Sequence, residues 1–145
     1  MSERDYIDTS ALAKWYLPED RSEDVTAYIQ QTAPLSISSL TMTEMRSLLG
    51  RRRREKTITS KMEGKVFAHF EEDIRAGYLV HRPLSDASFS GAIHLLTVLQ
   101  DHPLRTLDAL HLAVVKDFDA ATFATADRTL GRAASALGLI VVPFY

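Results

Sequence analysis

The sequence predicts an α/β fold with a mostly parallel sheet, and three observations support this. Five short segments have the composition of strands, and one or two segments with helical periodicity or capping signals separate each from the next. Strands that alternate with helices favour right-handed crossovers between parallel neighbours. A length of 145 residues, with 46% hydrophobic and 25% charged residues, is typical of one globular domain. We therefore expect residues 1–145 to form a single domain, a sheet flanked by helices.

The N-terminal half predicts two strands and the helices that connect them. Thr9 or Ser10 can cap the first helix, and Pro18 ends it because proline cannot continue a helix. Alternating residues before position 39 indicate the second strand. The expected elements are a strand over 5–8, helices to about residue 17 and over 22–32, a strand over 35–38, and a helix from about 41 to 54.

A helical hairpin arm follows, whose second helix begins near Ser60. The pair Ser60 and Glu63 has the capping-box spacing, and Gly77 is a suitable C-terminal stop. Apolar residues recur at helical period along this helix, at Met62, Val66, Phe70 and Ile74.

The C-terminal half predicts three more strands and three more helices. These elements are a strand over 78–81, a helix over 85–100 with Ile93, Leu96 and Leu99 on one face, a helix over 106–116, a strand over 121–126, a helix over 128–137 that ends at Gly138, and a strand over 139–142. The helix over 106–116 is apolar nearly all round, so we expect it to be central and buried.

Four acids lie where a predicted strand ends or a predicted helix begins: Asp8, Glu44, Asp108 and Asp127. In an open parallel sheet the carboxyl ends of the strands face one crevice, so acids delivered there converge. Unpaired carboxylates at close range repel each other, and a bound divalent cation relieves that repulsion. Carboxylate oxygens suit Mg²⁺ or Mn²⁺, and metal-assisted phosphodiester cleavage is the chemistry that this set indicates.

Each acid also has a structural interpretation that needs no metal. Asp8 and Asp127 can stabilise helix N-termini, and Glu44 follows Thr41 at the capping-box spacing. Asp108 is harder to explain, because it lies on a helix that is expected to be buried and therefore needs a partner. His111, three residues later, is either bonded to Asp108 or a satisfied core histidine.

Hydroxyl and basic groups supplement the acids. The hydroxyls of Ser10 and Thr125 lie beside predicted acids and can orient a water molecule or a phosphate. The net charge is −2, but basic residues cluster between positions 46 and 65. Some of them are either a solvated helix end or contacts to RNA or a protein partner, namely Arg46, Arg51, Arg52, Arg53 and Arg54.

Composition and motifs exclude several other classes. No apolar run is long enough to cross a bilayer, and the N-terminus does not have the pattern of a signal peptide. The absence of cysteine excludes disulfides and thiolate chemistry and fits a reducing, cytoplasmic location. No Walker A or G-x-G-x-x-G loop is present, so nucleotide-cofactor chemistry has no support.

The assembled motifs resemble the PIN-domain ribonucleases, specifically the VapC-type toxins of bacterial type II toxin–antitoxin pairs. The segments that carry the resemblance are Tyr6 to Leu12, Thr43 to Arg46, Thr106 to Ala113, and Ala124 to Asp127 with Leu130, Ala133 and Leu137 to Leu139. The resemblance implies a parallel five-stranded sheet and a Mg²⁺- or Mn²⁺-dependent endoribonuclease. It also implies that Asp8, Glu44, Asp108 and Asp127 form the acid pocket, with Ser10 and Thr125 as accessory groups. The resemblance further implies a homodimer and an antitoxin whose tail covers the pocket.

Two other functions compete with an endoribonuclease toxin that is neutralised by its antitoxin. A phosphatase or phosphotransferase with an aspartate nucleophile ranks lower, because Asp8 lacks a second acid two residues later. A non-catalytic RNA- or protein-binding domain on the same scaffold gains nothing from the mutual repulsion of four acids.

Overall fold

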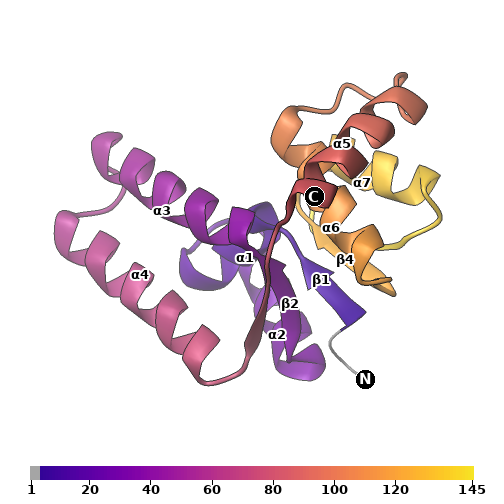
Figure 1. Ribbon diagram of the computed structural model, residues 1–145. Coiled ribbons are helices and arrows are strands. Elements are labelled where there is room, and N and C mark those ends of the chain that lie inside the picture. Colours follow the sequence, from indigo (N-terminus) through magenta and orange to yellow (C-terminus); the bar gives the residue numbers. More distant parts are fainter. Residues whose placement is uncertain (1–3) are drawn as a thin grey trace.

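A computed structural model describes residues 4–145 of the chain (Figure 1). Over these residues the predicted order of helices and strands is confirmed. The strands are β1 (Asp5–Ile7), β2 (Leu35–Ser38), β3 (Leu79–Arg82), β4 (Thr122–Thr125) and β5 (Ile140–Pro143). The helices are α1 (Thr9–Tyr16), α2 (Ser22–Thr32), α3 (Ser39–Arg54), α4 (Ser60–Arg75), α5 (Asp86–Val98), α6 (Thr106–Asp117) and α7 (Arg128–Ala136).

The five strands form one parallel sheet in the order β3-β2-β1-β4-β5, as predicted. Tyr6 on the central strand is in register with Ser36 of β2 and Phe123 of β4. The chain runs outward from β1 through β2 to β3 and then returns to the other side of β1 for β4 and β5. The order therefore reverses between β1 and β4, and this is the position where open α/β sheets bind ligands.

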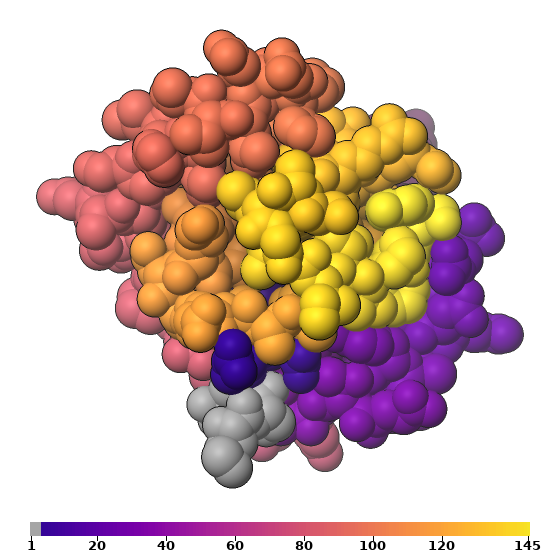
Figure 2. All heavy atoms as spheres, turned by 90° about the vertical axis from the view of Figure 1, so that its right-hand side faces the viewer, coloured from indigo at the N-terminus to yellow at the C-terminus, as the bar shows by residue number. Residues whose placement is uncertain are grey.

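Helices cover both faces of the sheet, because successive side chains of a strand point to opposite faces. Ile7 and Ala124 pack with α1, α2, α3 and α4, whereas Tyr6 and Phe123 pack with α5, α6 and α7. Figure 1 shows these two groups of helices on either side of the strands. Figure 2 shows α2, in violet, beside the yellow C-terminal residues, where Tyr28 packs against Phe144.

The predicted arm is present, since α3 and α4 run side by side and project from the sheet (Figure 1). Its predicted cap is wrong: the hydroxyl of Thr59, not Ser60, accepts from the amide of Met62. Glu63 is nearly buried and binds the guanidinium groups of Arg46 and Arg53 instead of the helix end. The arm is therefore joined by ion pairs between its two helices.

The residues predicted on one face of α5 differ in burial. Ile93 is 67% exposed and Leu96 is 38% exposed, whereas Leu99, just beyond the helix, is buried. The buried side of α5 consists of the smaller residues Ser88 and Ala92, together with Leu95. Small residues occupy this face because α5 packs closely against α6. Gly91, for example, approaches Ala113.

Helix α6 is central and buried as predicted, apart from Thr106 and Leu107 at its start and Lys116 and Asp117 at its end. The stops predicted at Gly77 and Gly138 are confirmed, because both have positive φ angles, of 88° and 86°, just after a helix end. None of the helices within residues 4–145 is long and apolar enough to cross a membrane.

Candidate active site

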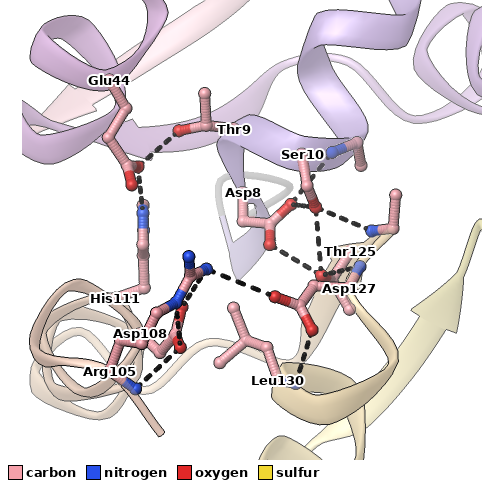
Figure 3. Close-up of polar contacts among 12 residues, drawn as sticks. Asp8, Thr9, Ser10, Glu44, Arg105, Asp108, His111, Thr125, Asp127 and Leu130 are labelled. Atoms are coloured by element: carbon pink, nitrogen blue, oxygen red, sulfur yellow. Dashed lines mark hydrogen bonds and ion pairs between the residues drawn. The ribbon is translucent and has the colours of Figure 1, made fainter. Parts of the chain in front are cut away.

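Three of the four predicted acids cap helix N-termini at the carboxyl edge of the sheet (Figure 3). Asp8 follows β1 and accepts from the amide of Ala11 in α1. Asp127 lies two residues after β4 and accepts from the amide of Leu130 in α7. Asp108, in the first turn of α6, accepts from the amide of Arg105. Asp8, rather than the predicted Thr9 or Ser10, is therefore the cap of α1.

Asp8 is the most enclosed of the acids, with 3% of its surface exposed. One carboxylate oxygen accepts from the hydroxyl of Ser10 at 2.7 Å, and the other accepts from the hydroxyl of Thr125 at 2.6 Å. Burial raises the pKa of Asp8, and the charge of His111 and these hydrogen bonds offset that rise only in part. Burial therefore makes the charged form of Asp8 less favourable than in water, and a cation beside it would offset that cost.

Ser10 and Thr125 also connect Asp8 to the start of α7. The Ser10 hydroxyl accepts from the amide of Ala126 at 2.9 Å, and the Thr125 hydroxyl accepts from the amide of Asp127 at 3.0 Å. Both hydroxyls thus orient the Asp8 carboxylate while they hold the loop after β4. We predicted the two residues as accessory groups to the acids, and they lie directly beside Asp8.

Arg105 lies among the acids and bridges two of them (Figure 3). Its guanidinium is 3.3 Å from one oxygen of Asp108, 3.4 Å from the other, and 3.7 Å from Asp127. The bond to Asp108 is the main cause that raises the pKa of Arg105. The side chain of Arg105 remains 79% exposed, so its guanidinium can leave the carboxylates without disturbing the core.

Glu44 is held differently, from the side of α3. Its Oε1 accepts from the hydroxyl of Thr9 at 2.7 Å and lies 2.6 Å from Nε2 of His111. Burial raises the pKa of Glu44, but the hydrogen bond and charge of His111 and the bond from Thr9 outweigh burial and lower it below its ordinary value. Glu44 is therefore held as a carboxylate.

The structural interpretation of Glu44 is wrong, and the structure decides between the two alternatives for His111. Thr41 forms a capping box with Ser38 at the start of α3, so Glu44 is not part of a cap. His111 is the satisfied core histidine of the two alternatives, because it is buried and contacts Glu44 and the hydroxyl of Tyr6, not Asp108. Helix α3 begins at Ser39, two residues earlier than expected, and this shift turns Glu44 from the helix end toward α6.

A groove of about 570 Å³ opens beside Glu44 between α3 and the start of α6. Its charged lining includes Glu44, Arg51 and Arg105. Its apolar wall consists of four leucines, Leu40, Leu48, Leu84 and Leu107. We call this the leucine groove; it combines apolar and cationic groups next to the acids.

Most of the basic residues that we considered for RNA or partner contacts have intramolecular partners. Arg46 and Arg53 bind Glu63, and Arg52 binds Glu19 at 2.6 Å. Arg51 lines the leucine groove, and Arg54 is exposed at the end of α3. Their charges are therefore distributed between the arm and the groove.

The four acids do not surround one point as they stand. Within residues 4–145, no three His, Asp or Glu side chains are arranged to hold a single ion. Mg²⁺ is often bound through only one or two carboxylates, with water molecules in the other positions. The donor set fits such an ion, because its oxygens are hard and a guanidinium already bridges two of the acids.

Two residues at this site were not predicted as functional. Thr9 was considered only as a helix cap, and Arg105 only as part of a loop. The available signals were that Thr9 follows Asp8 and that Arg105 lies three residues before Asp108. Residues three positions apart are neighbours at the start of a helix.

Comparison with known proteins identifies the family. A search of curated proteins finds no match. Among solved structures, FitAB bound to an IR36 DNA fragment is similar, with a TM-score of 0.71, 19% identity and coverage of 95% of this chain and 93% of that chain. FitAcB from Neisseria gonorrhoeae is also similar, with a TM-score of 0.65, 18% identity and coverage of 94% of each chain. These similarities concern the fold. The family model described as PIN domain matches residues 6–136, which is most of the chain, and the protein therefore belongs to the PIN domain family.

Proposed function

We propose that this protein is a metal-dependent endoribonuclease that acts as the toxin of a toxin–antitoxin pair. The observation that carries the proposal is the crevice at the reversal of strand order, where Asp8, Asp108 and Asp127 lie on helix N-termini and Arg105 bridges two of them. PIN domains are generally metal-dependent nucleases, and membership of that family supports the assignment.

The proposed cofactor is Mg²⁺ or Mn²⁺, held by Asp8, Asp108, Asp127 and Glu44 with water. When bound, such an ion activates water and neutralises charge on a phosphate. Ser10 and Thr125 keep both oxygens of Asp8 in place through their hydroxyl groups. A bound ion would take the place of Arg105 at the acids, and the exposed guanidinium of Arg105 would then be free to contact a phosphate of the RNA.

Cleavage of RNA by the purified protein tests this proposal. We expect cleavage that EDTA stops and that Mg²⁺ or Mn²⁺ restores, whereas Asp108→Asn protein is inactive. Binding of RNA without cleavage under all these conditions favours the non-catalytic alternative. Release of phosphate from a phosphomonoester instead of RNA cleavage favours the aspartate-dependent phosphatase. Mapping the cleavage sites in total RNA after induced expression in the cytoplasm, where RNA substrates are found, identifies the target.

The leucine groove supports a protein partner, the proposed antitoxin. An RNA strand has little use for four leucines, whereas an amphipathic peptide segment uses apolar and charged contacts together. The FitAB and FitAcB structures carry the names of two components, which fits a paired protein. We expect Leu48→Glu to abolish neutralisation of the toxin by its antitoxin while RNA cleavage persists. Neutralisation that survives this change removes the groove from the proposed interface.

The outer face of α5 supports a homodimer. Phe89, Ile93 and Leu96 are exposed on one side of this helix, and no charged residue occurs between Asp86 and Asp101. Exposed apolar stripes of this kind are typical of interfaces. We expect Ile93→Glu to convert a dimer into a monomer in light scattering, whereas the control His94→Glu, directed away from the stripe, leaves the dimer intact. A protein that is monomeric before any substitution contradicts the dimer.

A further inference from the structure

Glu44 is the one acid of the four whose hydrogen bonds all come from side chains, within residues 4–145. Asp8, Asp108 and Asp127 each accept from a backbone amide, so the start of a helix fixes them. The partners of Glu44 are the hydroxyl of Thr9 and the ring of His111. The position of this carboxylate therefore depends on groups that tertiary packing delivers.

Both partners of Glu44 bind the same oxygen. Thr9 and His111 contact Oε1, at 2.7 Å and 2.6 Å, and the carboxylate accepts both bonds. No described residue makes a hydrogen bond to Oε2, which belongs to a side chain that lines the leucine groove. This arrangement fixes the rotation of the carboxylate and leaves one oxygen for an incoming cation.

His111 is itself held from behind by a buried chain of hydrogen bonds. Its Nδ1 is 2.7 Å from the hydroxyl oxygen of Tyr6, and the same Tyr6 oxygen is 2.9 Å from the hydroxyl oxygen of Ser38. The carboxylate of Glu44 can only accept, so Nε2 of His111 carries a proton. The ring therefore has one donor directed at Glu44 and its other nitrogen engaged by the core.

Tyr6 anchors the chain to the centre of the sheet. It is fully buried on β1, and its ring stacks on Phe123 of β4 with an angle of 5° between the planes. The Tyr6 ring also meets the edge of His111 at a centroid distance of 5.8 Å. Close packing of this kind permits little movement. The two central strands therefore fix Tyr6, and through His111 they fix the position of Oε1 of Glu44.

We propose that His111, oriented by Tyr6, is a positioning residue that presents Oε2 of Glu44 to a divalent metal ion. This inference rests on the proposed metal site and assigns a role to two buried residues that are not metal ligands. Groups that orient a ligand in this way typically affect metal affinity about 10- to 100-fold.

Titration of the metal-free protein with Mn²⁺, followed by calorimetry, tests the proposal without an activity measurement. His111→Asn and His111→Gln form a matched pair: the amide nitrogen of glutamine reaches the position of Nε2, whereas that of asparagine reaches only the position of Nδ1. We expect His111→Asn to raise the Kd for Mn²⁺ about 10- to 100-fold, and His111→Gln to restore an affinity close to that of the wild type.

Tyr6→Phe removes one hydroxyl and keeps the stacked ring, so it tests the chain even if His111→Asn protein does not fold. We expect a smaller rise in Kd for this variant. Tyr28→Phe is the matched control, because it makes the same chemical change on α2, where Tyr28 packs against Phe144. Circular dichroism establishes that each variant is folded, and Tyr28→Phe should bind Mn²⁺ like the wild type.

The outcomes separate this inference from the function on which it rests. Wild-type protein that does not bind Mn²⁺ overturns the metal site and the inference together. If the wild type binds Mn²⁺ and folded His111→Asn or Tyr6→Phe protein binds it equally well, only the positioning role of that residue is overturned. Affinity that is as weak in His111→Gln as in His111→Asn indicates a packing role and also overturns the inference.

Discussion

The two sides of the acid crevice are built by different means. On the strand side, Asp8 follows β1 directly and Asp127 lies two residues after β4, and backbone amides one turn later fix both side chains. On the helix side, Glu44 lies in the second turn of α3, and its partners Thr9 and His111 come from α1 and α6.

The difference also appears in the electrostatics. Burial dominates for Asp8 and raises its pKa, whereas the contacts from His111 and Thr9 lower the pKa of Glu44. A cation beside Asp8 would therefore relieve the cost of its buried charge, whereas the Glu44 carboxylate is already stabilised as an anion by its hydrogen-bond partners. A crevice with both kinds of acid can attract a cation and still hold one ligand in place before the cation arrives.

Loss of activity is the largest expected effect, and it tests whether the two sides act together. We expect Asp108→Asn to lower RNA cleavage by more than about 100-fold, since a ligand should matter more than the groups that orient it. Asp8→Asn should behave alike. Cleavage by purified protein at saturating Mn²⁺ measures the effect, and unchanged cleavage by folded Asp108→Asn protein would falsify the catalytic assignment.

A smaller effect, on metal affinity, tests the role of the Arg105 guanidinium. Arg105→Gln removes the guanidinium that bridges Asp108 and Asp127, so Mn²⁺ should no longer have to displace it. The Arg105 side chain is 79% exposed, and ion pairs of exposed cations contribute about 0.2–1 kcal/mol, so we expect affinity to rise about two- to fivefold. Arg51→Gln is the control, because it removes the same charge from the same groove. An equal rise in both variants indicates long-range charge alone.

Opposite changes in thermal stability sharpen the comparison of Asp8 with Glu44. In EDTA at neutral pH, Asp8→Asn should raise the melting temperature by a few degrees, because asparagine can still cap α1 and no charge is buried. Glu44→Gln should lower it, because His111 and Thr9 lose their anionic partner. A change of the same sign in both variants contradicts the assignment of different roles. Mn²⁺ should then stabilise the wild type more than either variant.

The pH dependence of stability is the smallest expected effect. A raised pKa means that folded protein binds the Asp8 proton more tightly than unfolded protein, so this contribution is present below pH 3.8 and lost as the pH rises. The advantage of Asp8→Asn should therefore shrink as the pH falls toward 3.8. The contribution of Glu44 has the opposite sign: it is present above pH 4.5 and lost as the pH falls through the lowered pKa. Unfolding curves of both variants between pH 3 and pH 8 measure the two trends.

Local patterns predicted the elements well and their detailed partners less well. Helix α3 was expected from Thr41, but Ser38 is the cap, and that shift removed the simple explanation for Glu44. Helical spacing placed Ile93, Leu96 and Leu99 on one face, yet α5 packs largely through smaller side chains and leaves Ile93 and Leu96 exposed. In both cases, several positions satisfied the same local rule, and packing between distant elements selected one of them.

The sequence by itself determined the alternation of strands and helices, the two glycine stops and the placement of acids at strand ends. Those features depend on neighbours within one turn or one strand, so the local chemistry of the chain is sufficient for them. Only the tertiary structure decided that Arg105 bridges two acids and that Glu44 is bound to His111, which in turn is bound to Tyr6. Tyr6 and His111 are 105 positions apart, and Glu44 and His111 are 67 apart, so the folded sheet brings them within hydrogen-bonding distance.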